Sequence, residues 1–107
     1  MQLDVHAKDI DLIDSLRIYV EEKIGGIEKF IDAFDLEGGV SIRVKLERTT
    51  NHHKKGDVYQ ASADLHLPGK SMHASASHYD MHAAIDELRD KLLHEIETLK
   101  GKVAENG

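Results

Sequence analysis

Three successive runs of alternating apolar and polar residues limit what this chain can fold into more than any other feature. The runs are VSIRVKLER at 40–48, VYQASADLHL at 58–67 and KSMHASAS at 70–77. A period of two is typical of a β-strand with one buried and one exposed face. The polar segment TTNHHKKGD and the pair Pro68-Gly69 separate the runs, and both are turn signals. The sequence therefore predicts a three-stranded meander.

Residues 2–8 also alternate and predict a further strand at the start of the chain. Two segments with helical periodicity complete the order. The first follows Asp11 or Asp14, either of which can cap it, and Gly25-Gly26 should bend or thin it because each glycine costs about 1 kcal/mol in a helix interior. The second starts near 77–80. Their apolar stripes are Leu16, Val20, Ile24, Ile27 and Ile31, and Met81, Ala84, Ile85, Leu88, Leu92, Ile96 and Leu99.

These patterns together predict an α+β domain with the order β-α-β-β-β-α. Each strand has one apolar face and each helix has one apolar stripe, so two helices packed on one face of a four-stranded sheet bury all of them. At 107 residues the chain is the size of a single domain. The other face of the sheet should meet solvent or a partner, and it carries Arg43, Lys45, Gln60, Ser62, His66, His73 and Ser75.

Composition excludes several classes of function. The chain has no cysteine, which rules out disulfides and thiolate chemistry, and it has no tryptophan and few aromatic residues, which disfavours a platform for stacked bases. No signal peptide and no apolar run of about 20 residues is visible, so we predict a cytoplasmic protein without a membrane partner. The formal net charge of −6 argues against nucleic acid unless basic residues gather locally.

His78, His82 and Asp86 are spaced four residues apart and raise the question of a metal site. Ser77 with Asp80 three residues later resembles a helix cap, which would place His78 at the first helical position, where its direction is poorly defined. The pattern HExxH and a third ligand at zinc spacing are both missing. We therefore predict a capped helix with solvated histidines and no metal.

Catalytic motifs are also missing. The sequence contains no Gly-x-Ser-x-Gly elbow and no glycine-rich phosphate loop, and its paired acids fall on helix surfaces. We predict that the protein is not an enzyme and needs no cofactor or small-molecule substrate. Two basic features remain as candidates for binding, although both are also ordinary solvated surface. They are the HHKK segment at 52–55 and the outward row of Arg43 and Lys45 with Arg48 at the strand end.

Two further runs, LRIYVEEKIGGIEKF at 16–30 and DMHAAIDELRDKL at 80–92, resemble the ribosome hibernation promoting factors, also called ribosome-associated inhibitors or sigma-factor modulation proteins. In that family the last helix begins Asp-Met-Tyr-x-Ala-Ile-Asp, and here His82 replaces the tyrosine. The resemblance implies a protein that binds the small ribosomal subunit between head and body, overlaps the transfer RNA and messenger RNA sites, and inhibits translation. The chain looks like a short member or the N-terminal domain of a longer one.

The resemblance also implies contacts to ribosomal RNA along both helices and the adjoining sheet. The positions that match are Lys8, Arg17, Lys29, Lys91, Lys100 and Lys102. The facing of the predicted elements adds Lys23, Arg43 and Lys45, and Arg89 is included as a further basic residue on the last helix. We expect these cations to gather into one continuous surface on folding. This chain departs from the family at Ser77, His94 and Thr98, where other members have basic residues.

From these departures we expect His82 and His94 to replace fixed cations in part and to strengthen RNA binding near pH 6. Two other functions stay open at this stage. One is a protein-interaction module that modulates a transcription (sigma) factor, and the other is a general binder of double-stranded RNA.

Overall fold

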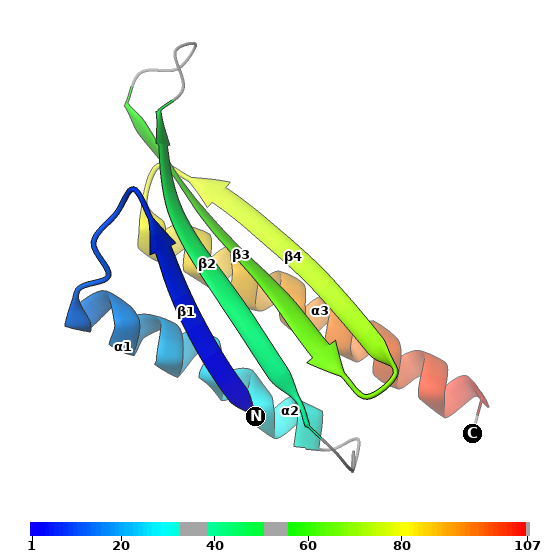
Figure 1. Ribbon diagram of the computed structural model, residues 1–107. Helices are drawn as coiled ribbons and strands as arrows, with labels where there is room; N and C mark the ends of the chain where they lie inside the picture. The colour runs from blue at the N-terminus through cyan, green and yellow to red at the C-terminus, as the bar shows by residue number, and fades with distance from the viewer. Residues whose placement is uncertain (33–38, 51–55, 107) are drawn as a thin grey trace.

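The computed structural model describes residues 1–32, 39–50 and 56–106 and shows a sheet with its helices on one face (Figure 1). A short 3₁₀ turn, η1, joins the first two helical segments. The elements in chain order are β1 (Gln2–Lys8), α1 (Asp14–Lys23), η1 (Gly25–Ile27), α2 (Glu28–Asp32), β2 (Ser41–Thr50), β3 (Asp57–Leu67), β4 (Lys70–His78) and α3 (Met81–Asn106).

The four strands form one sheet in the order β1-β2-β3-β4. β1 runs parallel to β2 because the α1–η1–α2 segment carries the chain back across the sheet, whereas β2, β3 and β4 pair antiparallel through hairpins. Gly69 has a φ of +78°, the left-handed conformation that the second central residue of a type II turn needs. The predicted fold class, element order and turn are confirmed.

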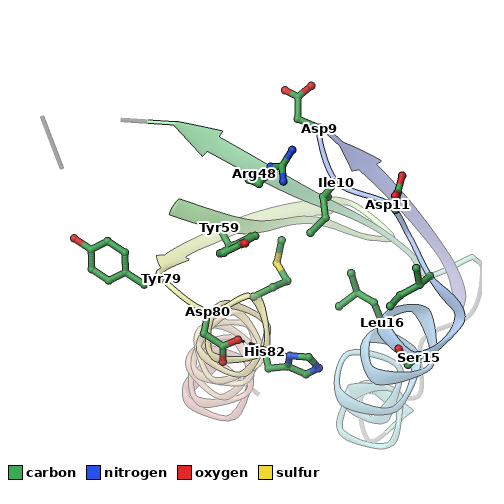
Figure 2. Close-up of a pocket in the computed structure, with 12 residues that line it drawn as sticks. Asp9, Ile10, Asp11, Ser15, Leu16, Arg48, Tyr59, Tyr79, Asp80 and His82 are labelled. Carbon is green, nitrogen blue, oxygen red and sulfur yellow. Dashed lines mark ion pairs between the residues drawn. The ribbon is translucent and has the colours of Figure 1, made fainter. Parts of the chain in front are cut away.

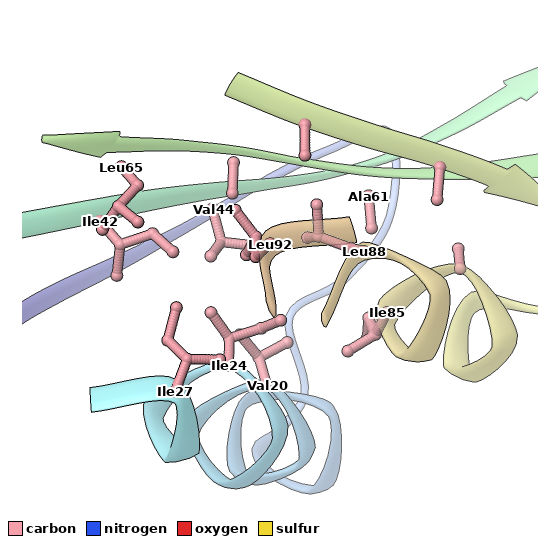
Figure 3. Close-up of a cluster of buried hydrophobic side chains, with 14 of the residues drawn as sticks. Val20, Ile24, Ile27, Ile42, Val44, Ala61, Leu65, Ile85, Leu88 and Leu92 are labelled. Carbon is pink, nitrogen blue, oxygen red and sulfur yellow. The ribbon is translucent and has the colours of Figure 1, made fainter. Parts of the chain in front are cut away.

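The core lies between the sheet and the helices, where apolar side chains from both layers meet (Figure 3). Val44 and Leu46 of β2, Ile24 after α1 and Leu92 of α3 are all fully buried. Among the described residues no polar or charged side chain is buried, which agrees with one apolar stripe on each helix and one apolar face on the sheet. None of the described helices is long and apolar enough to cross a membrane.

The start of α3 differs from the prediction. Strand pairing continues to His78, which is opposite Tyr59, and the helix begins only at Met81. Asp80, not Ser77, caps it, because the Asp80 carboxylate accepts a hydrogen bond from the Ala83 backbone N–H at 3.2 Å. His78 is therefore the last residue of a strand and not the first of a helix.

The start of α1 also differs. Asp14 is the first helical residue and Ile13 occupies the cap position without a side-chain hydrogen bond, so neither Asp11 nor Asp14 caps the helix as expected. The weak point at Gly25-Gly26 is confirmed, since the α-helix gives way there to the 3₁₀ turn η1. The helical segment still places Ile24, Ile27 and Ile31 on the buried side.

Candidate nucleic-acid interface

The cations expected to form one surface lie on separate parts of the molecule. The open sheet face, opposite the helices, carries Lys8, Arg43 and Lys45. We use the name helix seam for the outer surface between α1–α2 and α3, defined by Tyr19, Lys23, Lys29, Phe30, His82, Asp86, Arg89 and Lys100. Arg17 lies on the flank of α1 away from Tyr19, because the two residues are two positions apart and each position turns the helix by about 100°. The expected single continuous surface is therefore not formed by the described residues.

On the open sheet face, each cation lies among carboxylates. The ammonium groups of Lys8 and Lys45 are 3.6 and 3.7 Å from the two oxygens of Glu47. Arg43 lies opposite Asp4 on β1 and Asp64 on β3. Exposed ion pairs of this kind contribute little to stability, but a phosphate must compete with them for the same cations.

The upper part of the helix seam is organised around Tyr19. Its hydroxyl donates a hydrogen bond of 2.5 Å to Asp86 on α3, and the His82 ring packs edge-on against it with centroids 4.5 Å apart. The Lys23 ammonium lies 5.6 Å from the same ring. The hydrogen bond to Asp86, with smaller contributions from burial and the charges of Asp86 and Asp80, raises the pKa of Tyr19 to about 12. Tyr19 thus stays neutral and holds the two helices together.

The lower part of the helix seam is organised around Phe30, which is half-buried. The ammonium groups of Lys29 on α2 and Lys100 on α3 lie 5.3 and 5.7 Å from its ring. An aromatic ring attracts a cation without neutralising it. Neither Lys23 nor Lys29 makes an ion pair with any side chain that the structure describes. A phosphate that binds Lys23 or Lys29 therefore has no described carboxylate to displace.

Arg89 belongs to the helix seam, because it follows Asp86 by three residues on the same side of α3. Its guanidinium is 3.8 Å from Asp90, and Arg17 is likewise 3.7 Å from Asp14. Lys102 lies within α3, but its side chain is outside the described residues, as is the whole HHKK segment at 52–55.

Lys91 faces the opposite flank of α3, toward the edge of the sheet. Its ammonium donates a 2.7 Å hydrogen bond to the Ser75 backbone carbonyl of β4. A groove of about 570 Å³ runs along this flank and is lined by carboxylates as well as by Lys91. The carboxylates belong to Glu87, Asp90 and Glu95. Lys91 therefore anchors α3 to the edge strand in acidic surroundings.

His78 and His82 turn to different neighbours. His78 Nε2 lies 3.0 Å from Glu87, whereas His82 packs on Tyr19 and lies 3.8 Å from Asp80. Among the residues that the structure describes, no group of three or more potential ligands is placed to hold a metal ion. The spacing that suggested a metal site does not correspond to one helical face, because His78 precedes the helix.

Arg48 lies on the side of the sheet that the helices cover, since it alternates with Glu47 and pairs with Tyr59. There it lines an open cavity of about 770 Å³ at the end of the molecule where α1 and α3 begin (Figure 2). The description of Arg48 as part of the outward cationic row was therefore wrong. The sequence reasoning also missed Tyr19 and Phe30 as supports for lysines, although Tyr19 and Lys23 have the i, i+4 spacing that could have shown it.

Comparison with known proteins settles the family. The family model described as "Sigma 54 modulation protein / S30EA ribosomal protein" matches residues 3–104. The chain belongs to this family. The prediction that it is not an enzyme is confirmed by this membership.

Relatives in the family match over nearly the whole chain. A protein of Escherichia coli strain K12 named ribosome hibernation promoting factor is 32% identical over 106 residues, which cover 99% of this chain and 100% of that one. A protein of Azotobacter vinelandii with the same name is 37% identical over 92 residues, or 86% of this chain and 76% of that one.

Two solved structures show the same fold. The Thermus thermophilus Protein Y N-terminal domain has a TM-score of 0.74 at 21% identity and covers 92% of this chain and 99% of that one. A ribosomal subunit interface protein from Coxiella burnetii has a TM-score of 0.70 at 20% identity and covers 94% and 99%. At these identities the likeness supports the fold alone.

Proposed function

We propose that the chain is a ribosome hibernation factor that binds the small ribosomal subunit at the transfer RNA and messenger RNA channel and inhibits translation. Residues 1–107 act as one ribosome-binding domain, and the protein works in the cytoplasm among the ribosomes. The observation that carries the proposal is the alignment of 99% of this chain with 100% of a protein named ribosome hibernation promoting factor.

The helix seam is the part of the surface best suited to ribosomal RNA. Lys23 lies against the Tyr19 ring and Lys29 against the Phe30 ring. Binding of a phosphate to either lysine therefore breaks no ion pair with a carboxylate that the structure describes. Lys100 reaches the Phe30 ring from the other helix. Cations held at fixed positions along two parallel helices can follow a phosphate backbone without reading bases.

The cations of the open sheet face play a lesser part in this proposal. Lys8 and Lys45 share Glu47, and Arg43 lies between two aspartates, so this face is close to electrically balanced. Because the remainder of the molecule is acidic, the balance between surfaces orients the chain on RNA with its helix seam inward.

Two assays test the function. The protein should sediment with purified small subunits, and this binding should decrease when transfer RNA and messenger RNA are bound first. It should also inhibit translation in a reconstituted system in proportion to the fraction of subunits occupied. Binding that bound transfer RNA leaves unchanged would contradict the channel, and binding without inhibition would contradict the effect on translation.

The family description also names modulation of sigma 54, which favours a protein-interaction module as the second candidate. That candidate predicts complex formation with the sigma factor and no salt-dependent binding to subunits. A general binder of double-stranded RNA would instead bind any long duplex in competition with the subunit. The same sedimentation assay, with sigma factor or duplex RNA added as competitor, separates the three functions.

A further inference from the structure

The cavity at the end of the molecule where α1 and α3 begin takes no part in the function proposed above. It is formed by three segments that are distant in the sequence: the connection from β1 to α1, the paired ends of β2 and β3, and the start of α3. Its volume of about 770 Å³ is large enough to receive a side chain together with its adjoining backbone. Leu16 and Met81, both buried, form part of its lining.

Exposed apolar side chains border this cavity. Ile13 is 59% exposed and Tyr79 is 64% exposed, and they are two of the three large apolar side chains that the described surface exposes. Both line the cavity, from the α1 and the α3 side respectively. Tyr79 projects outward from the loop before α3, beyond the end of the sheet (Figure 2). Exposed apolar groups gathered around one hollow are typical of an interaction site.

The charges around the cavity are mainly negative. Among the lining residues that the structure describes, Asp9, Asp11 and Asp80 are acidic and Arg48 is the one fixed cation. Neither Asp9 nor Asp11 makes a hydrogen bond or ion pair with a residue that the structure describes, whereas Asp80 caps α3. Asp9 also has a φ of 58°, a left-handed conformation in which aspartate and asparagine are enriched. A phosphate backbone would meet repulsion here, and a cationic partner would not.

We propose that this cavity docks a Lys- and Arg-rich segment of a partner protein, with one apolar side chain of that segment in the hollow beside Ile13 and Tyr79. The flanking lysines or arginines pair with Asp9 and Asp11. Apolar burial supplies the anchor, and the carboxylates select a basic sequence over an acidic one.

The docking site and the helix seam share His82, which lines the cavity and packs on Tyr19, but the lysines around Phe30 lie at the other end of the helical layer. The cavity lies where α1 and α3 begin, whereas Lys29 and Lys100 lie near the ends of the helical layer. A molecule that contacts RNA through its lysines can therefore hold a basic protein segment at the same time. Docking at the cavity does not depend on the ribosome being the RNA partner.

Titration of the ¹⁵N-labelled full chain with the synthetic peptide acetyl-KRLKR-amide tests the proposal by chemical-shift mapping. We expect saturable shifts confined to residues around the cavity, among them Ile13, Arg48 and Tyr79. Replacing the leucine of the peptide by serine should remove the shifts, because the anchor is lost. A peptide with glutamate in place of every lysine and arginine should give none.

Two protein variants identify the groups responsible. Asp9→Asn with Asp11→Asn should weaken the peptide by about five-fold, because two exposed charge contacts are lost. Asparagine also tolerates the left-handed backbone at position 9. The matched control Glu95→Gln with Glu97→Gln removes as many charges from the far half of α3 and should change the affinity by less than about two-fold. Tyr79→Ser should weaken binding without changing the charge, and the spectrum itself reports whether each variant is folded.

Three results would overturn the proposal. The first is a set of shifts scattered over the whole acidic surface, and the second is an equal loss in the aspartate and glutamate variants, since both would mean unspecific charge attraction. The third is a stronger response of the cavity residues to a hexauridylate than to the peptide, which would make this an RNA site.

Discussion

The open sheet face and the helix seam carry similar numbers of predicted cations, yet their neighbours differ. On the sheet, Lys8 and Lys45 share one glutamate. On the helices, Lys23 and Lys29 lie against aromatic rings. A carboxylate cancels the charge of a lysine, whereas a ring holds the lysine in place and leaves its charge intact.

The difference teaches that a count of lysines and arginines does not define a binding surface in an acidic protein. The formal net charge of −6 describes neither surface. On the sheet each cation lies beside a carboxylate, whereas on the helix seam Lys23 and Lys29 pair with no carboxylate that the structure describes. In the proposed function, the helix seam differs from the sheet face by the rings of Tyr19 and Phe30, against which its lysines lie.

The largest expected effect comes from the core that supports both surfaces. Leu92 is fully buried between α3 and the sheet. Leu92→Ala should lower the free energy of unfolding by about 2–5 kcal/mol through lost burial and a residual cavity. Urea denaturation followed by circular dichroism measures it. A loss below about 1 kcal/mol would show that the helical layer is held by something other than this core.

Phe30→Leu tests whether the aromatic ring positions the lysines of the helix seam, because it removes the ring and keeps an apolar side chain. Lys29 and Lys100 lose the surface that positions them, and binding to small subunits should weaken by about three-fold, the size of an exposed cation–π contact. Sedimentation at fixed salt measures the change. Unchanged affinity, with unchanged stability as the control, would mean that the ring does not orient the lysines.

Lower pH should strengthen subunit binding. His82 lies on the helix seam beside Tyr19, Asp80 and Asp86, whereas His94 lies on the opposite flank of α3, along the groove with Glu87, Asp90, Lys91 and Glu95. Because these histidines are expected to replace fixed cations in part, subunit binding should be tighter at pH 6 than at pH 8 in matched salt. In the variant His82→Gln with His94→Gln this pH dependence of the affinity should be smaller. Equal affinity of the unaltered protein at both pH values would contradict a role for these histidines in RNA binding.

The smallest effect concerns the hydrogen bond between Tyr19 and Asp86. Because the pKa of Tyr19 is raised from 10.0 to about 12, the folded state holds the phenol proton more tightly than the unfolded chain does. The resulting stabilisation is complete below about pH 10 and is lost as the pH rises through about 12. Urea midpoints of the unaltered protein and Tyr19→Phe should therefore converge over that interval. A difference that stays constant up to pH 12 would contradict this.

The fold could be predicted because each helix and strand has a recognisable pattern in its own stretch of sequence. The alternation at 40–48, 58–67 and 70–77 and the stripes through Val20 and Leu88 each leave one apolar face to bury, and few architectures bury them all. The helix starts were less predictable. Whether Ser77 or Asp80 caps α3 depends on how far β4 pairs with β3, and that is a tertiary contact.

The candidate site could be predicted only in part. Lysine positions are visible in the sequence, but the approach of Lys29 and Lys100 to one ring joins residues from different helices. Glu47 cancels lysines on two strands for the same reason. The cavity beside Ile13 and Tyr79 is formed by three distant segments, so no local pattern indicates it.

The salt dependence of subunit binding tests the central claim most directly, with Lys23→Glu and Lys29→Glu compared against Arg43→Glu and Lys45→Glu. Both pairs reverse the same amount of charge. The helix-seam variant should bind at least about ten-fold more weakly and show a shallower slope of log affinity against log salt, whereas the sheet variant should stay within about three-fold of the unaltered protein. An equal loss in both, or a larger loss in the sheet variant, would contradict the account.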